Sequence, residues 1–142
     1  MECIFCRIAK GEVPATIVYE DENVLAFLDV NPRAKGHTLV IPKTHAATLL
    51  DLSEEQAGVL FAAVRKVAHR LTHELGAVGL NIGLNSGQVA GQVVPHVHVH
   101  ILPRYEGEAP KGFEEAFFVK EELKKGVESA PKGLIDNLSP WI

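Results

Sequence analysis

The sequence predicts an α+β fold, an antiparallel five-stranded sheet with one long helix and a shorter helix. Three observations favour this class: five short segments rich in aliphatic and β-branched residues, one long segment with apolar residues at helical spacing, and short connections between neighbouring strands. The chain of 142 residues is long enough for one domain with a substantial core.

Turn residues separate five segments with strand character: 16–20, 24–30, 37–41, 79–84 and 96–102. The turn signal Asp21–Asn23 predicts that the first two segments form a hairpin. Proline has no backbone N–H and restricts the residue before it, so Pro32 ends the second segment and Pro42 stops the third. We expect the last strand to end at Pro103-Arg104.

Two helices are expected, a short turn at residues 3–10 and a long helix at about residues 53–75. Ser53, followed three residues later by Gln56, has the pattern of a capping box, and Gly76 supplies the stop. The long helix repeats its apolar residues at helical spacing: Leu60, Val64, Val67, Leu71 and Leu75.

Residues 1–104 carry all of these patterns, whereas residues 105–142 form a charged tail. A further helix is expected at 113–125, and Trp141 near the end needs a packing partner. We expect this tail to pack on the same domain or on a dimer partner.

The composition is that of an ordinary soluble protein, 46% hydrophobic and 23% charged, with a net charge of −4. No basic field favours nucleic-acid binding, and no apolar stretch reaches the length of a membrane span. The N-terminus has no secretory signal, so we expect a cytoplasmic protein without a membrane or nucleic-acid partner. A small phosphorylated ligand is compatible with the charge, because binding it needs only a local site.

The most informative segment is the run His96-Val97-His98-Val99-His100-Ile101-Leu102. Successive side chains of a strand point to opposite faces, so the three histidines share one face and the aliphatic residues between them share the other. We expect the aliphatic face to pack into the core and the histidine face to stay open. Such a row fits a neutral imidazole that attacks phosphorus or three imidazoles that bind zinc, and the triplet alone does not decide.

A glycine-rich stretch, residues 85–92, precedes the histidines. Its backbone N–H groups can form an anion nest, and Asn85, Ser86 and Gln92 add neutral hydrogen-bond donors. The same glycines also fit ordinary turns. Their position just before the triplet favours a phosphate cradle.

Cys3 and Cys6 have the spacing of half a zinc site, which then needs two further ligands, although both also fit small buried hydrophobes. His69 and His73 lie on the polar side of the long helix, so we interpret them as solvated. His45 follows the third strand segment and is better placed to meet the N-terminal turn.

Asp29 ends the second apolar segment. One interpretation is a turn-capping carboxylate beside Asn31 and Pro32. The other is a carboxylate that accepts the hydroxyls of a ribose, as in many nucleotide sites. The residues alone leave both open.

Together these features resemble the histidine-triad (HIT) superfamily of nucleotide hydrolases and transferases. The family's signature alternates three histidines with hydrophobic residues, and residues 96–102 match it in full. The resemblance covers about residues 1–104, and further motifs follow the family's order: Cys3-Ile4-Phe5-Cys6, Phe27-Leu28-Asp29, Gly36-His37 through His45, Asn85-x-Gly87 and Gly91-Gln92.

The resemblance implies that His98 is the nucleophile that takes the α-phosphate as a nucleotidyl-histidine intermediate. It implies that His100 contacts phosphate and helps to protonate the leaving group, with His37 as a fourth, supporting histidine. Val93 stands where some branches carry Ser or Thr, so it offers no donor to the leaving atom. The implied nucleotide-binding set, with Asp29 as the ribose ligand, is Phe27, Leu28, Asp29, Val30, Asn85, Gly91, Gln92 and Val93.

The resemblance further implies a homodimer whose sheets join, no catalytic metal, and a structural zinc on Cys3, Cys6, His45 and His96. The expected reaction is hydrolysis at the α-phosphate of a purine nucleotide, releasing AMP or GMP from phosphoramidates or dinucleoside polyphosphates. His100 favours hydrolysis, because the uridylyl-transferase branch has glutamine there. Two alternatives stay open: a zinc-dependent hydrolase with the triad as metal ligands, and a non-enzymatic purine-nucleotide-binding adaptor.

Overall fold

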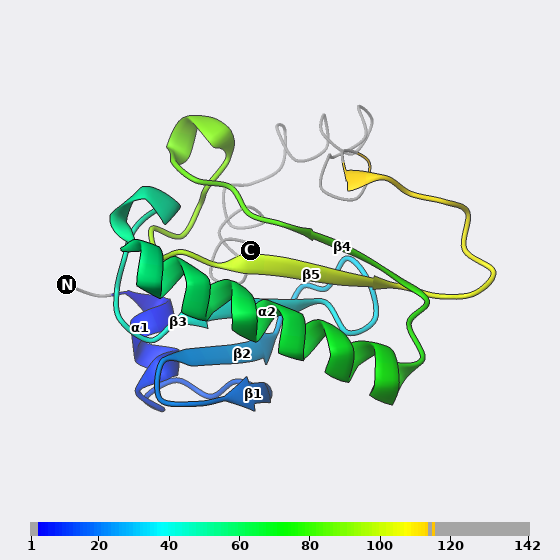
Figure 1. Cartoon of the computed structure of the whole chain (residues 1–142), viewed down its shortest axis with the longest axis horizontal. Helices are drawn as coiled ribbons and strands as arrows, with labels where there is room; N and C mark the ends of the chain where they lie inside the picture. The colour runs from blue at the N-terminus through cyan, green and yellow to red at the C-terminus, as the bar shows by residue number, and fades with distance from the viewer. Residues whose placement is uncertain (1–2, 114, 116–142) are drawn as a thin grey trace.

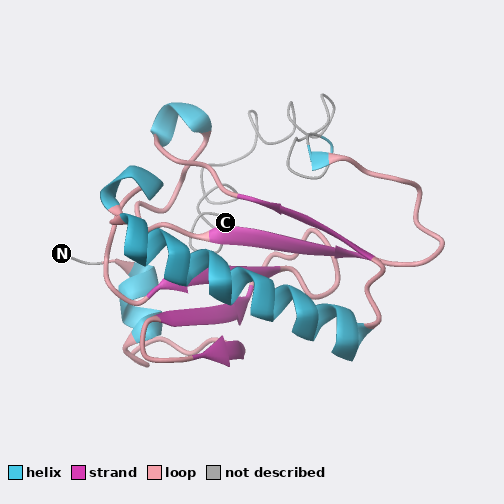
Figure 2. Cartoon of the chain, viewed as in Figure 1, coloured by secondary structure: helices cyan, strands magenta, loops and turns pink. Residues whose placement is uncertain are grey.

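A five-stranded antiparallel sheet in the order β1-β2-β3-β5-β4 organises the chain in this computed structural model (Figure 1). The structure describes residues 3–113 and 115. Over these residues the predicted class is confirmed, with one long and one short α-helix and two 3-10 turns added to the sheet (Figure 2). In chain order the elements are α1 (Ile4–Ala9), β1 (Ile17–Glu20), β2 (Val24–Leu28), β3 (Thr38–Pro42), η1 (Leu49–Asp51), α2 (Glu54–Leu75), β4 (Gly79–Gly83), η2 (Gln88–Ala90) and β5 (Val99–Arg104).

The long helix α2 crosses one face of the sheet (Figure 1). The predicted capping box is present, because the Ser53 hydroxyl accepts from Gln56 N and the Gln56 side chain accepts from Ser53 N. Gly76 ends the helix with a left-handed backbone, φ 76°. The core under α2 takes alternate residues of three strands and one stripe of the helix: Val24, Ala26, Val40, Leu60, Ala63, Val64, Val67, Leu71, Val97, Val99 and Ile101.

The opposite face of the sheet packs against the short helix α1. Phe5 and Ile8 of α1 are buried against the other alternate residues of β2 and β3, and the rings of Phe5 and Phe27 meet edge to face at 5.5 Å. This second core consists of Cys3, Phe5, Ile8, Leu25, Phe27, Leu39, Ile41 and Val94. The histidines of the triad lie on this face, since His100 pairs across the sheet with Leu39.

The prediction that the histidine face stays open is wrong. His96, His98 and His100 are between 0% and 4% exposed, because α1 and the loop after β2 cover them. The aliphatic face packs into the core under α2, as predicted. The open face was expected because the aliphatic side chains between the histidines fill the core on the other side, but neutral imidazoles with hydrogen-bond partners also tolerate burial.

Several predicted strand limits differ from the observed ones. β5 begins at Val99 because the preceding N–H groups bond outside the ladder, with Val97 N donating to Ala46 O at 2.8 Å. It ends at Arg104, as predicted, and it includes Pro103 because its pairing with β3 stops at Ile101. β3 likewise includes Pro42, at its last position, and β2 ends before Asp29.

The chain after β5 folds back onto β4. Asn81 Nδ2 donates to Lys111 O at 3.2 Å, and the ring of Phe113 lies so close to Gly83 that a Cβ on Gly83 would overlap it. Gly83 is the cross-strand partner of His100. Most of the helix predicted at 113–125, together with Trp141, lies outside the described residues.

Within the described ranges, none of the helices has the length and apolar character that a membrane crossing requires.

Candidate active site

Two clusters of titratable side chains lie on the α1 face of the sheet, and they divide the three histidines of the triad between them. Among the described residues, the groups with convergent ligand-type atoms are Cys3, Cys6, His45 and His96 in one place, and Asp29, His37 and His100 in the other. His98 stands between the clusters, with its ring centroid 5.1 Å from that of His100.

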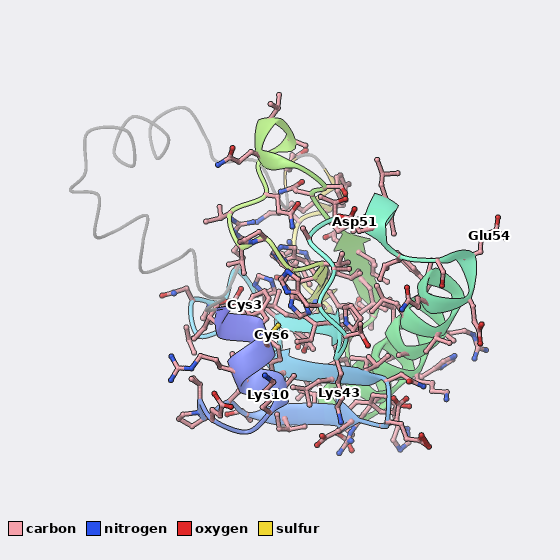
Figure 3. The ribbon with its side chains drawn as sticks, turned by 90° about the vertical axis from the view of Figure 1, so that its left-hand side faces the viewer. Cys3, Cys6, Lys10, Lys43, Asp51 and Glu54 are labelled. Carbon is pink, nitrogen blue, oxygen red and sulfur yellow. The ribbon has the colours of Figure 1, made fainter. Side chains whose placement is uncertain are left out.

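The first cluster has the geometry of a tetrahedral metal site. His96 Nδ1 lies 3.4 Å from Cys3 Sγ, 3.5 Å from Cys6 Sγ and 3.3 Å from His45 Nδ1, and Cys6 Sγ lies 3.3 Å from His45 Nδ1. Nitrogen and sulfur ligands around one tetrahedral zinc ion stand about 3.3–3.8 Å apart. Figure 3 shows Cys3 and Cys6 next to each other on α1. These four residues therefore fit zinc.

The orientation of His96 supports the same interpretation. Its Nε2 lies 2.8 Å from the carbonyl oxygen of Pro42, which can only accept, so Nε2 carries the proton and Nδ1 presents its lone pair to the cluster. A histidine ligand usually donates its second ring N–H to such a partner. Without a metal, burial and the neighbouring Cys3 raise the pKa of the Cys6 thiol to about 11, a cost that a bound cation removes.

His98 has its tautomer assigned in the same way. Its Nδ1 lies 2.8 Å from the carbonyl oxygen of His96, so Nδ1 carries the proton and Nε2 carries the lone pair. The ring of Phe5 packs edge-on against His98 at 5.1 Å and limits its movement. A neutral imidazole held in one tautomer is what nucleophilic attack on phosphorus requires.

The second cluster is a chain of hydrogen bonds that begins at the backbone. The N–H of Arg33 donates to His37 Nδ1 at 3.1 Å, so the proton of His37 sits on Nε2, which donates to His100 Nδ1 at 3.0 Å. His100 then carries its own proton on Nε2. Because this tautomer leaves His37 Nε2 without a lone pair, the cluster suits proton transfer rather than metal binding.

Burial sets the protonation of this cluster. Desolvation, with the charges of Arg33 and Arg104 as smaller causes, lowers the pKa of His37 to about 3, and desolvation holds the pKa of His100 lower still. Burial has the opposite effect on a carboxyl group and raises the pKa of Asp29 to about 7. The two imidazoles are therefore neutral at physiological pH, whereas Asp29 is poised between its two states.

Part of the predicted nucleotide-binding set lines a common pocket. Leu28, Asp29 and Val30 line a pocket together with four residues that the sequence did not single out: Pro14, Ala15, Thr16 and Pro32. Phe27, by contrast, has no exposed surface, so it supports this wall from behind. Pro14, Ala15 and Thr16 come from the segment before β1, and sequence patterns give no signal that this segment runs beside the end of β2.

The polar residues of the glycine-rich loop differ in whether their side chains bond within the protein or lie exposed. Gln92 was expected to bond the ligand, but its carboxamide accepts from Gly87 N and donates to Ala47 O and Val94 O, so it braces the loop. Asn85 is exposed, and a Cβ at Gly91 would lie 3.4 Å from its Nδ2. Gly91 also has a positive φ of 97°, so the loop requires glycine there. Val93 is 45% exposed and has no polar atom to offer a ligand.

Sequence reasoning missed Phe5 and Arg33. Phe5 was quoted only as part of a motif, yet its ring contacts both His96 and His98. Arg33 contributes through its backbone N–H, and residue identity carries no signal for a backbone donor. His69 and His73 are exposed on α2, in agreement with the prediction that they are solvated.

Comparison with known proteins agrees with this site. Residues 10–107 match the HIT domain family, and the chain belongs to that family. The chain is 54% identical over 106 residues to an uncharacterized HIT-like protein of Methanocaldococcus jannaschii, a match that covers 75% of this chain and 81% of that protein. It is 45% identical over 104 residues to the adenosine 5′-monophosphoramidase hnt1 of Schizosaccharomyces pombe, with 73% and 75% covered.

A crystal structure with a related fold bears on the metal. A Zn-bound histidine triad family protein from Mycobacterium smegmatis is 37% identical and superposes with a TM-score of 0.72, over 92% of this chain and 99% of that one. The predicted family and fold are thereby confirmed. Extension of the sheet across a dimer stays a prediction.

Proposed function

We propose that this protein is a nucleotide hydrolase that acts at the α-phosphate through a nucleotidyl-histidine intermediate on His98. The observation that carries the proposal is the tautomer of His98, whose Nδ1–H is committed to His96 O at 2.8 Å and whose Nε2 carries the lone pair. The enzymes named among the relatives include a nucleoside phosphoramidase, which supports the same class of reaction. The expected product is a purine nucleoside monophosphate, AMP above all.

In the first displacement, His98 Nε2 attacks the α-phosphorus, a P–N bond forms, and the bond to the leaving group breaks. The leaving atom takes the electron pair of the broken bond and receives a proton. The Nδ1–H···O bond to His96 stabilises the positive charge that develops on the His98 ring. The exposed Asn85 side chain is the proposed donor to the phosphoryl oxygens, because the N–H groups of Gly87, Ala90, Gly91 and Gln92 already bond within the loop 85–92.

In the second displacement, water attacks the phosphorus and the P–N bond to His98 breaks. The nucleoside monophosphate leaves, and His98 returns to its neutral tautomer. None of these steps needs a metal ligand from His98 or His100. The division of the triad between two clusters argues against the alternative in which all three histidines hold a catalytic zinc.

A covalent adduct tests the proposal directly. The protein is mixed with adenosine 5′-phosphoramidate or a diadenosine polyphosphate, quenched within seconds and weighed by mass spectrometry. We expect one added AMP mass on the native chain and on His69→Ala, a matched control that removes an exposed histidine, but none on His98→Ala. AMP binding without an adduct or turnover on any substrate would instead identify a nucleotide-binding adaptor.

A structural zinc ion on Cys3, Cys6, His45 and His96 completes the proposed site. The support is the set of ligand separations and the bond from His96 Nε2–H to Pro42 O. When bound, the ion would tie α1 to the strand that carries the nucleophile. Metal analysis tests this proposal, and about one zinc per chain is expected in the native protein. The Cys6→Ser variant is expected to lose the zinc. The control variant Lys10→Ala, which changes a residue close to Cys6 that is not a ligand, is expected to keep it.

A homodimer joined through β4 is also proposed. β4 is the last strand in the sheet order, and Ile82 on it is 38% exposed. Light scattering at micromolar concentration is expected to give the mass of two chains for the native protein. Ile82→Lys should shift the mass toward one chain, and a native monomer would exclude the joined sheet.

A further inference from the structure

The proton positions of the His37–His100 pair depend on a backbone N–H group. Two neutral imidazoles can share one hydrogen bond in either direction. In the observed direction, His37 Nε2 donates to His100 Nδ1 at 3.0 Å, and His100 keeps its own proton on Nε2. In the reverse direction, His100 Nδ1 would donate to His37 Nε2, and His100 Nε2 would carry a lone pair instead of a proton. The N–H of Arg33 decides between the two, because it donates to His37 Nδ1 at 3.1 Å and so excludes a proton from that nitrogen.

This N–H belongs to a tight turn, residues 33–37. His37 N donates to Ala34 O at 3.0 Å and closes the turn from inside. A Cβ on Gly36 would lie 2.6 Å from the Leu75 side chain, so the turn packs closely against the end of α2. A displacement of the turn would carry the Arg33 N–H away from His37.

The hydroxyl of Tyr105 holds the outer side of the turn. Tyr105 directly follows β5, and its Oη donates to Lys35 O at 2.6 Å. The backbone of Tyr105 is held in turn by Glu108, because Tyr105 N donates to Glu108 Oε2 at 2.7 Å and Glu108 N donates to Tyr105 O at 3.2 Å. Burial and the charge of Glu108 raise the pKa of the Tyr105 hydroxyl, so it remains a donor at neutral pH. The strand that carries His100 is therefore followed by the residue that anchors the turn.

We propose that Tyr105 is a positioning residue that fixes the proton positions of the His37–His100 pair. Its bond to Lys35 O holds the turn, and the turn holds the Arg33 N–H against His37 Nδ1. His100 then keeps its proton on Nε2. The proposal rests on the proposed function, in which His100 Nε2–H is a donor to the phosphate and the leaving group. Tyr105 acts only through the backbone of the turn.

Histidine tautomers give a readout that needs no substrate. Tyr105→Phe removes the hydroxyl and keeps the aromatic ring. We expect the reverse tautomers to become populated, because the Arg33 N–H is no longer held against His37. Nitrogen-15 chemical shifts of labelled histidines distinguish a protonated ring nitrogen from one with a lone pair. The signals of the pair are assigned by their loss in His37→Asn and His100→Asn.

A pair of substrates gives the functional readout. The values of kcat/KM are measured for adenosine 5′-phosphoramidate, whose amine needs a proton donor to leave, and for the p-nitrophenyl ester of AMP, whose phenolate leaves without one. We expect Tyr105→Phe to lower the ratio of the first value to the second by about tenfold, a fraction of the usual effect of general acid catalysis. A turn that only weakened nucleoside binding would affect both substrates equally, because both contain the same AMP group.

Tyr19→Phe is the matched control. It removes the same hydroxyl from the hairpin between β1 and β2, where Tyr19 Oη donates to Asp21 Oδ2 at 2.7 Å. This variant should keep the native nitrogen shifts and the native ratio of the two substrates.

Native nitrogen shifts in Tyr105→Phe would overturn the proposal, as would an unchanged ratio of the two substrates. A native protein with the proton on His37 Nδ1 would overturn it without any variant, so the test does not depend on the folding of Tyr105→Phe. The proposed function fails in a different way: the native protein would hydrolyse neither substrate and form no adduct on His98, while the tautomers would still report the effect of Tyr105.

Discussion

The neutral state of the buried imidazoles is the residue-level property on which the site depends. His37 is held between the N–H of Arg33 and the Nδ1 atom of His100, and both imidazole rings are buried. A protonated ring here would have no acceptor for its second N–H and would lose its hydration. The same burial that keeps these rings neutral raises the pKa of the Asp29 carboxyl to about 7.

The pH dependence of the free energy of unfolding should reflect the opposite pKa shifts of Asp29 and His37. The pKa of Asp29 is raised from 3.8 to about 7 in the folded chain, so its stabilising contribution is complete below pH 3.8 and is lost as pH rises to about 7. The lowered pKa of His37 has the opposite effect, with stability lost as pH falls below 6.5. Asp29→Asn removes only the first contribution.

Urea unfolding of the native protein and of Asp29→Asn at several pH values tests this sign. The free energy of unfolding of the variant minus that of the native protein should rise with pH between about 4 and 7, by up to about 1.4 kcal/mol per pH unit. Metal release in acid affects both proteins and cancels in the difference. A flat difference would mean that burial does not raise the pKa of Asp29.

The Gln92 side chain has a structural role, because its hydrogen bonds hold the glycine-rich loop in place. Its carboxamide accepts from Gly87 N in the loop and donates to Ala47 O and Val94 O outside it, so it ties the loop to two neighbouring segments. Gln92→Leu keeps the approximate volume and leaves these groups unpaired, so we expect a loss of about 1–3 kcal/mol in stability. Chemical denaturation measures the loss. Gln88→Leu on the exposed turn η2 is the matched control, and an equal effect of the two variants would contradict the bracing role.

At the scale of elements, helices were predicted more accurately than strands. α2 begins and ends where the sequence indicates, because Ser53, Gln56 and Gly76 act on their own neighbours. The start of β5 differs from the prediction because it depends on β3 and on the segment around Ala46, which are distant in sequence. Helix caps and helix stops can be recognised from the neighbouring residues, whereas the partner strands that set the limits of a β-strand cannot.

A double-mutant cycle can measure the contact between Gly83 of β4 and the ring of Phe113. A Cβ at Gly83 would overlap the Phe113 ring, while its φ does not demand glycine. We expect Gly83→Ala to cost about 1 kcal/mol in the native chain and less than about 0.3 kcal/mol in a Phe113→Ala background. Thermal unfolding of the four proteins gives the coupling. Equal costs in both backgrounds would show that the ring does not rest on β4.

At the scale of the whole molecule, the candidate metal cluster joins the first helix to a strand about ninety residues later. The spacing of Cys3 and Cys6 indicates half a site, chain order already favoured His45, and family resemblance supplied His96. The residues alone could not choose His96 among the three triad histidines, because the choice depends on α1 lying beside the end of β3. The tautomers could not be predicted either, since the carbonyls of Pro42 and His96 set them.

Removal of the metal should affect stability more than chemistry. Chelation of the zinc-loaded protein is expected to lower the unfolding midpoint by about 10 °C or more, because four ligands from three separate segments lose their common partner. At a temperature where the metal-free chain keeps its circular dichroism, turnover should stay within about tenfold of the native rate. Complete loss of turnover in a folded, metal-free protein, restored by zinc, would support a catalytic metal instead.

The strand that carries the histidines separates two environments, the core under α2 and the clusters on the α1 face, by nothing more than the alternation of its side chains. Insertion or deletion of one residue between His96 and His100 would exchange the two faces of this segment. The imidazoles would then lie under α2, and the valines would lie among the titratable clusters on the α1 face. Point substitutions in this segment remove one function at a time. A single-codon insertion or deletion would remove the core, the metal ligand and the nucleophile together, so length variation should be tolerated in the loops and never in this strand.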